Sequence, residues 1–342
     1  MNLLLLLFIF LLYCTPTLAQ NQANEWFFGE NCWVSFKTGS PVVQSGGALY
    51  TYEGATSISD AEGRLLFYTE GTTIWNSQHS VMQNGAGLVG GTSSTQAAII
   101  LPHPGNPNQY YIFTSADRTN FLSGSGFHFS IVDIQLNEGL GAVIEKNSIL
   151  LPSNISEAVT ATVDCSGKGY WILTHSEQGN TFYAFHLTRN GLNTKPVVTS
   201  LGTPSEFYFQ PFLKFSPNSR KLALSNNQDA APALSIYDFD NTNGTVSAQK
   251  VLLNNPKEGC YGVTFSHDNS KLYAGHRGTE VDTYRDSSIV QFNISLPTLE
   301  EIRASMFHIK RRGIALAMQM ARDGKIYVTQ GEYLAAIEKP NL

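Results

Sequence analysis

The sequence predicts an all-β protein built as a β-propeller. An apolar strand, a polar turn, a second strand, a loop and a third strand follow one another six times along the chain. Successive turns lie roughly 45 to 60 residues apart, a period typical of propeller blades. Short apolar stretches after the third strand, at 149–151, 197–198 and 251–253, supply a fourth and outermost strand in three of the copies.

Each copy is defined by three expected strands and by the turn between the first two. The strands lie at 56–59, 65–69 and 73–75; at 97–101, 110–114 and 127–134; at 159–163, 170–174 and 182–187; at 213–215, 222–224 and 234–239; at 263–265, 272–274 and 289–294; and at 315–320, 326–328 and 334–337. The turns lie at 60–63, 105–108, 164–168, 216–220, 266–270 and 322–324. Asp, Asn and Ser in such turns hydrogen-bond to their own backbone, and glycine accepts a positive φ angle.

The two ends of the repeat array decide how the ring closes. The sixth copy stops after its third strand, and residues 26–36 also have the composition of strands. We therefore expect either a six-bladed propeller whose last blade is completed by this early segment, or a truncated seven-bladed propeller. Closure matters because an open ring exposes unpaired strand edges.

The first residues have the features of a secretory signal peptide. Residues 3–12 are an uninterrupted apolar run, and Thr17-Leu18-Ala19 provides a cleavage site after Ala19. The run is shorter than the roughly 20 apolar residues of a membrane span, and no second such run follows. We expect a signal peptide at 1–19, a single propeller domain at 20–342, no transmembrane span, and a secreted or cell-surface location.

Charge and cysteine content narrow the range of partners. With 22 basic and 27 acidic residues the net charge is -5, so no global positive field exists to hold a nucleic-acid backbone. Cys32, Cys165 and Cys260 form no closely spaced pair, so we predict neither a disulfide framework nor a zinc site and expect small buried residues instead. The sequence favours a monomer, or a module of a larger protein, without a nucleic-acid partner.

Three stretches near the amino terminus carry a resemblance to a known group of proteins. They read NEWFFG at 24–29, ATSISDAEGRLLFYTEGTTIWN at 55–76 and GTSSTQAAIILPHPGNP at 91–107. They resemble the amino-terminal propeller region of large secreted proteins of gliding bacteria, which usually continue into PKD modules and a type IX secretion sorting domain. Residues 215–218 (FSPN) resemble TolB-type and surface-layer propeller repeats. The resemblance implies an extracellular or cell-surface location and a binding or adhesion role, and it supplies no catalytic residues.

The candidate ligand site lies in the loops of one propeller face. That face carries the loops that enter each blade and the loops between second and third strands, around the mouth of the central channel. Its candidate binding residues are Glu53, Asp117, Arg118, Glu157, His175, Asn226, Glu258 and His276. If they converge, they can hold a sugar or a peptide. The other interpretation is that surface loops are polar because their backbone groups need water.

Acidic residues recur where the chain enters a blade, at Glu53, Glu157 and Glu258. A ring of carboxylates can hold calcium through oxygen ligands, whereas the simpler interpretation is that each carboxylate caps nearby backbone amides. Residues 238–244 share the composition of a calcium loop but not its ligand spacing, so we predict a strand-ending turn there. We expect no cofactor apart from this possible calcium.

Two functions of different classes fit these features. The first is a non-catalytic scaffold outside the cytoplasm that binds a carbohydrate, a peptide or a cell-envelope partner. The alternative is a metal-dependent propeller hydrolase or lactonase, in which acidic and histidine side chains at the mouth bind a metal that activates water. Convergence of the three glutamates with His175 and His276 would favour the enzyme, and dispersal would favour the scaffold. The fold alone cannot decide, because propellers host both.

Overall fold

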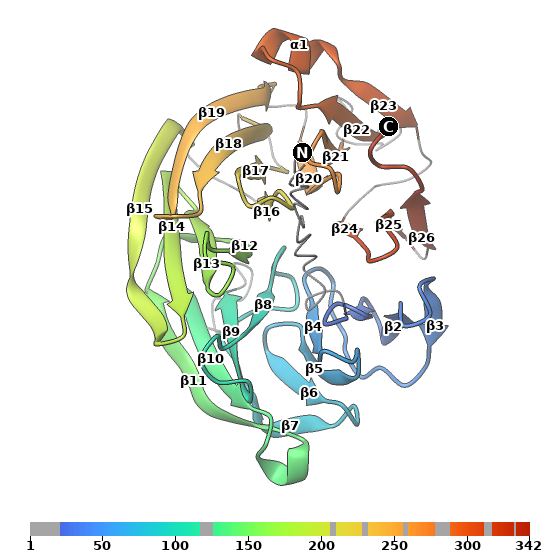
Figure 1. The fold of residues 1–342 in the computed structure, drawn as a ribbon, viewed down its shortest axis with the longest axis vertical. Helices are drawn as coiled ribbons and strands as arrows, with labels where there is room; N and C mark the ends of the chain where they lie inside the picture. Colours follow the sequence, from blue (N-terminus) through green and yellow to red (C-terminus); the bar gives the residue numbers. More distant parts are fainter. Residues whose placement is uncertain are drawn as a thin grey trace, which may run out of the picture.

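Seven antiparallel blades stand around a common axis in the computed structural model, as Figure 1 shows. The structure describes residues 21–116, 126–205, 210–227, 232–255, 259–277, 288–310, 317–331 and 333–342. Five of the described blades have four strands, and blades 1 and 7 have three. The outer strands of blades 2 and 3 also pair in parallel at Gln83 and Ala142, which joins these two blades into one eight-stranded sheet. The all-β propeller prediction is therefore confirmed.

The strands of each blade follow chain order from the axis outward. Blades 1 to 3 contain β1 (Glu25–Phe28), β2 (Cys32–Ser35) and β3 (Val42–Gln44); β4 (Thr56–Ser59), β5 (Leu65–Thr69), β6 (Thr73–Asn76) and β7 (Val81–Ala86); and β8 (Ala98–Pro102), β9 (Gln109–Ser115), β10 (Phe127–Asp133) and β11 (Ala142–Leu151). Blades 4 and 5 contain β12 (Ile155–Val163), β13 (Tyr170–Ser176), β14 (Gly179–Thr188) and β15 (Gly191–Ser205); and β16 (Phe212–Phe215), β17 (Lys221–Ser225), β18 (Leu234–Asp240) and β19 (Thr245–Leu253).

Blades 6 and 7 complete the ring and carry one of the two helices. They contain β20 (Cys260–Phe265), β21 (Lys271–His276), β22 (Ser288–Asn293) and β23 (Phe307–Lys310); and β24 (Met318–Met320), β25 (Ile326–Gln330) and β26 (Tyr333–Ile337). The helices of the described ranges are η1 (Asn137–Gly139) and α1 (Leu299–Ala304), and a capping box between Thr298 and Glu301 starts α1. Neither is long and apolar enough to cross a membrane. The three predicted fourth strands lie within β11, β15 and β19.

The turns between first and second strands form for the predicted reason. Asp60 Oδ1 accepts hydrogen bonds from the backbone N–H groups of Glu62 and Arg64, and Asp268 Oδ1 accepts one from Ser270. Asp164 makes the same kind of turn. Partial burial pushes its pKa up, but hydrogen bonds from Ser166, His186 and nearby backbone groups outweigh burial and lower that pKa to about 2. Side chains in these turns thus satisfy backbone donors that the strands leave unpaired.

The core is divided among the blade interfaces. Seven clusters of buried apolar side chains are present in the described chain, and each combines residues of two adjacent blades. Phe182 of blade 4, for example, packs against Tyr237 of blade 5, with ring centroids 5.0 Å apart. Seven interfaces for seven blades mean that the ring is closed by packing.

Closure does not use the six-bladed arrangement. Strands β1, β2 and β3 pair with one another and not with β24–β26, so the early segment is a blade of its own. The reason is that its aromatic residues face two neighbours at once. Phe27 stacks on Tyr68 of blade 2 at 3.8 Å, while Phe36 packs at 5.3 Å from Tyr327 of blade 7. The seven-bladed alternative gives the correct blade number, but the ring is not truncated, because blade 1 packs directly against blade 7.

The cysteines only partly fit their expected role. Cys260 is fully buried, as expected, but Cys32 is half-buried and Cys165 is exposed in a turn. The exposure of Cys165 arises because residues 164–169 form the turn at the edge of blade 4, where its backbone N–H donates to the carbonyl of Asn241. Among the residues that the structure describes, none of the three forms a disulfide bond.

Candidate functional site

Five of the eight predicted site residues fall within the described chain, on the face that carries the loops entering the blades. Glu53 precedes β4, Glu157 lies in β12, His175 lies near the end of β13, Asn226 follows β17, and His276 ends β21. Asp117, Arg118 and Glu258 lie outside the described residues. We call this side the loop face, and the opposite side, with the turns between first and second strands, the turn face.

Glu157 connects blade 4 to the loop that enters blade 3. Its Oε2 accepts hydrogen bonds from the backbone N–H and the hydroxyl of Thr95, at 3.0 and 2.9 Å. The Glu157 carbonyl accepts a further bond from the hydroxyl of Ser115 at 3.1 Å. Because these groups are buried, Glu157 satisfies donors that water does not reach.

A second part of the same network crosses the channel mouth. The Tyr261 side chain, from innermost strand β20 of blade 6, lies close enough to the side chains of Thr95 and Glu53 for both to influence its pKa. Glu53 Oε1 also accepts a bond from Gln210 Nε2 at 2.8 Å, and Gln210 Oε1 accepts one from Asn227 Nδ2 at 2.8 Å. Burial, followed by the charge of Glu53, raises the pKa of Tyr261 well above its ordinary value, so this tyrosine stays neutral.

The Gln96 side chain links blades 3 and 5, which are not neighbours in the ring. Its Nε2 donates to the carbonyl of Leu213 at 3.0 Å, and its Oε1 accepts from the N–H of Leu213 at 2.8 Å. Leu213 lies in the innermost strand of blade 5, whereas Gln96 lies in the loop that leads into blade 3. Together these residues form the mouth network, which ties blades 2 to 6 across the channel: Glu53, Thr95, Gln96, Glu157, Gln210, Asn227 and Tyr261.

The rings of the two histidines contact their own blades, whereas the backbone of Asn226 connects blade 5 to blade 6. His175 Nδ1 donates to the Ser176 carbonyl at 2.6 Å, its ring meets Phe182 edge-on, and burial lowers its pKa to about 4. The ring of His276 meets that of His308 edge-on at 5.8 Å. Asn226 is fully buried, and its backbone bonds to Ala233 and Cys260. Of the predicted site residues, Glu53 and Glu157 belong to one shared network.

Two acidic residues of the loop face, Glu70 and Glu157, have protein partners. Glu70, which follows β5, is buried and accepts hydrogen bonds from the Thr72 hydroxyl and from the Thr73 N–H at 3.1 Å. Glu157 likewise caps the loop of Thr95. Within the described residues, no three His, Cys, Asp or Glu side chains gather in a way that would hold a metal ion.

Replacing Glu157 by alanine is expected to lower the free energy of unfolding by about 2 kcal/mol, because the buried Thr95 N–H loses its acceptor. Urea unfolding of the purified protein measures the change. Glu62→Ala is the matched control, since this exposed carboxylate pairs with exposed Arg64 and should change stability by less than about 0.5 kcal/mol. Equal effects of the two substitutions would contradict the structural role of the mouth network.

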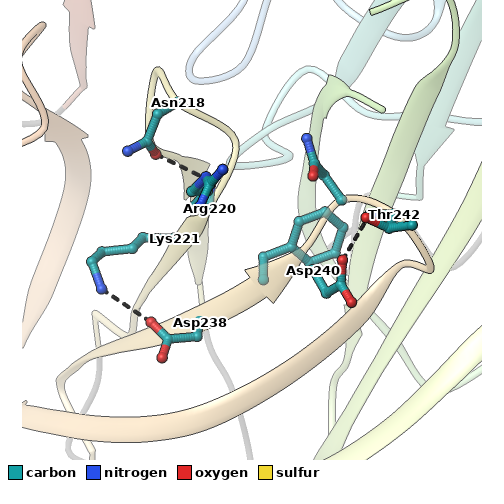
Figure 2. Close-up of a pocket in the computed structure, with 8 residues that line it drawn as sticks. Asn218, Arg220, Lys221, Asp238, Asp240 and Thr242 are labelled. Atoms are coloured by element: carbon teal, nitrogen blue, oxygen red, sulfur yellow. Dashed lines mark hydrogen bonds and ion pairs between the residues drawn. The ribbon is translucent and has the colours of Figure 1, made fainter. Parts of the chain in front are cut away.

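A concave site lies on the other side of the ring, on the turn face of blade 5. Figure 2 shows this pocket, of about 490 Å³, which we call the blade-5 pocket. Its walls come from the β16–β17 turn, the start of β17, the end of β18 and the β18–β19 turn. Its lining residues are Asn218, Arg220, Lys221, Asp238, Phe239, Asp240, Asn241 and Thr242.

Hydrogen bonds hold the walls of the blade-5 pocket in place. Asp240 Oδ1 accepts from the Thr242 N–H at 2.9 Å (Figure 2). The Asn241 carbonyl accepts from Trp171 Nε1 of blade 4 at 2.9 Å. Lys221 Nζ lies 3.0 Å from Asp238 Oδ1, an ion pair with both side chains partly exposed. Residues 238–244 therefore form a strand end and a turn, as predicted.

Sequence reasoning missed this pocket. Residues 216–220 and 238–244 were each predicted as turns, but their polar residues come together only because antiparallel β17 and β18 place two turns on one edge of the blade. The available signal was Lys221, a charged residue directly before the buried apolar run 222–224, since it marks where β17 begins beside the turn.

Comparisons with known proteins leave the family open. No family model and no curated protein matches this chain. The β-propeller domain of Cps50 (Swd1) from Myceliophteria thermophila is similar over 92% of this chain and 99% of its own, with a TM-score of 0.47 and 10% identity. Hsv2 of Kluyveromyces lactis is similar over 91% of this chain and 87% of its own, with a TM-score of 0.49 and 9% identity.

A third similar structure is a quinoprotein alcohol dehydrogenase-like protein from Bacteroides thetaiotaomicron. It covers 94% of this chain and 74% of its own, with a TM-score of 0.49 and 12% identity. At sequence identities this low, neither the ligand nor the reaction of these proteins can be assigned to this chain.

Proposed function

We propose that this protein is a non-catalytic binding scaffold that works outside the cytoplasm and holds a carbohydrate in the blade-5 pocket. The observation that carries the proposal is the mixed polar lining of this pocket on a rigid, closed ring. The signal-peptide features of residues 1–19 support the location.

The chemistry of the lining matches hydroxyl groups. A sugar hydroxyl donates one hydrogen bond and accepts others, so a sugar site needs donors and acceptors side by side. Arg220 and Lys221 provide donors, while Asp238 and Asp240 provide acceptors. With two basic and two acidic side chains the formal charge of the lining is balanced, which favours a neutral ligand over an ion. A volume of about 490 Å³ suits a small molecule or a short glycan segment.

The mouth network supports a scaffold for a second reason. Its carboxylates and amides bond to one another, so in the described part of the mouth they brace the channel instead of surrounding an open cavity. A propeller hydrolase needs several ligands converging on one metal. Within the described chain, the predicted histidines pack inside their own blades.

Titration calorimetry with neutral hexasaccharides of glucose, xylose and N-acetylglucosamine tests the proposal. Arg220→Ala is expected to weaken binding about tenfold or more, because a charged donor to a hydroxyl is lost. Arg64→Ala is the matched control, since Arg64 occupies the corresponding turn of blade 2 and lies outside the pocket. If none of these sugars binds, or if Arg220→Ala binds as well as the parent protein, the carbohydrate proposal fails.

The alternative function has its own test. A lactone and ester panel is incubated with the purified protein in millimolar calcium and then in EDTA. No turnover is expected in either condition. Hydrolysis that EDTA abolishes would replace the scaffold by a metal-dependent enzyme.

A further inference from the structure

Four aromatic rings form one continuous stack across the interface of blades 1 and 2, and we call them the aromatic stack. Trp33 of β2 stacks on Phe27 of β1 with ring centroids 5.4 Å apart, and Phe27 stacks on Tyr68 of β5 at 3.8 Å. Tyr68 stacks in turn on Trp75 of β6 at 5.6 Å. The interplanar angles along this series are 17°, 3° and 15°. The π systems of the two blades are therefore in direct contact.

The aromatic stack runs from the surface into the interior and back to the surface. Trp33 and Trp75 at its two ends are partly exposed, whereas Phe27 and Tyr68 in its middle are 3% and 0% exposed. Indole and phenol rings lose one electron far more readily than a phenyl ring does. A one-electron oxidant in solution therefore reaches a tryptophan at an end of the stack but does not touch Tyr68 directly.

Two rings of the aromatic stack are each hydrogen-bonded to a base. Tyr68 Oη donates to His79 Nδ1 at 3.1 Å and accepts from the Ala48 N–H at 3.1 Å. Burial lowers the pKa of His79, so its ring is neutral at neutral pH and Nδ1 has a lone pair that accepts a proton. Trp33 Nε1 donates to Glu25 Oε2 at 2.6 Å. Packing alone needs apolar area at these positions, but it does not need a base beside each ring.

The two bases change what happens when a ring of the aromatic stack loses an electron. An oxidised phenol is a strong acid, and a positive charge held in an apolar interior is costly. A base within hydrogen-bond distance removes this cost, because the proton leaves together with the electron, and His79 has this position beside Tyr68. At Trp33 the Glu25 carboxylate attracts the positive charge of an oxidised indole. Trp33 is thus favoured as the entry point of an oxidation and Tyr68 as its end point.

We propose that the aromatic stack is a radical relay, which passes an oxidising equivalent from Trp33 at the surface to Tyr68 in the interior. A one-electron oxidant, such as a peroxyl radical in solution, first removes one electron from the Trp33 indole. One electron then moves from the Tyr68 phenol through Phe27 to Trp33, which restores the neutral indole. The phenolic proton moves to His79 Nδ1, so the products are a neutral tyrosyl radical and an imidazolium. The relay spares Trp33 from irreversible oxidation, and it is independent of the blade-5 pocket.

Flash photolysis of the purified protein with a ruthenium tris-bipyridine oxidant and persulfate tests the relay. Transient absorption follows the tryptophan and tyrosyl radicals, and peptide mapping by mass spectrometry measures oxidised Trp33. Tyr68→Phe keeps the ring in the stack but removes its hydroxyl, so the tyrosyl signal should fall and oxidised Trp33 should increase. Tyr110→Phe is the matched control, because Tyr110 is 5% exposed in blade 3, where its ring meets that of Phe67, and both readouts should stay unchanged.

A second variant separates the relay from a structural role of the ring. His79→Gln keeps a hydrogen-bonding side chain beside Tyr68 but cannot take up the proton, so it should also lower the tyrosyl signal and increase oxidised Trp33. Oxidised Trp33 at the parent level in both variants overturns the proposal. If a variant fails to fold, the parent protein in heavy water decides, because a proton that moves with the electron slows the rise of the tyrosyl signal. Equal rates in light and heavy water overturn the relay.

Discussion

Replacement of Phe36 by alanine is expected to lower the free energy of unfolding by about 3 to 5 kcal/mol. Phe36 is fully buried between the first and last blades, with ring centroids 4.5 Å from Trp26 and 5.3 Å from Tyr327. Its removal leaves a cavity at the interface that closes the ring, where the polar support shown is the bond from Arg322 Nη1 to Asn24 Oδ1 at 2.8 Å.

Urea unfolding followed by tryptophan fluorescence measures this loss. Phe307→Ala is the control, because Phe307 is 61% exposed on the rim and its truncation removes little buried area. A loss below about 1 kcal/mol for Phe36→Ala would mean that contacts between blades 1 and 7 do not stabilise the ring.

The stability of the protein is expected to fall by about 3 kcal/mol between pH 6.5 and pH 4 because of His175. Burial lowers its pKa from 6.5 to about 4 in the folded protein. Between these two values the unfolded chain binds a proton that the folded chain does not, so acid favours unfolding. The contribution is fully retained above pH 6.5 and lost as the pH falls through the folded pKa.

Unfolding midpoints at half-unit pH steps, for the parent protein and His175→Asn, test this expectation. The variant should be less stable at pH 7 but should show a flatter slope between pH 6.5 and 4. Burial also lowers the pKa of His79 and His128, so some slope should remain in the variant. The carboxylate of Asp164, with a pKa of about 2, takes up its proton below pH 4 and so does not contribute to this slope. Identical slopes would show that His175 is protonated without cost.

Local chemistry made the strands and turns predictable. The stretch from Asp60 to Arg64 contains its own turn-forming hydrogen bonds, so its structure depends on residues at most four positions apart. The same holds for residues 238–244, which were predicted as a turn and form one. The fourth strands of blades 2 and 6 were missed because β7 and β23 lack a continuous apolar run.

Contacts between distant residues made the candidate sites unpredictable. Glu53 and Gln210 are 157 positions apart, and their hydrogen bond exists because loops entering blades 2 and 5 meet at the channel mouth. The prediction that polar loop residues converge there applies to Glu53 and Glu157, whereas His175 turned inward to its own blade. No pattern within a single repeat indicates which of these directions a polar side chain takes.

The sequence by itself determined the all-β class, the repeat and the turns, because each depends on composition or on neighbouring residues. Only the tertiary structure decided that there are seven blades, that residues 25–44 form the first of them, and that the mouth is braced across the channel. These features depend on which faces pack together once the ring closes. Phe27 and Phe36 carry the same apolar signal in sequence, yet one packs on blade 2 and the other on blade 7.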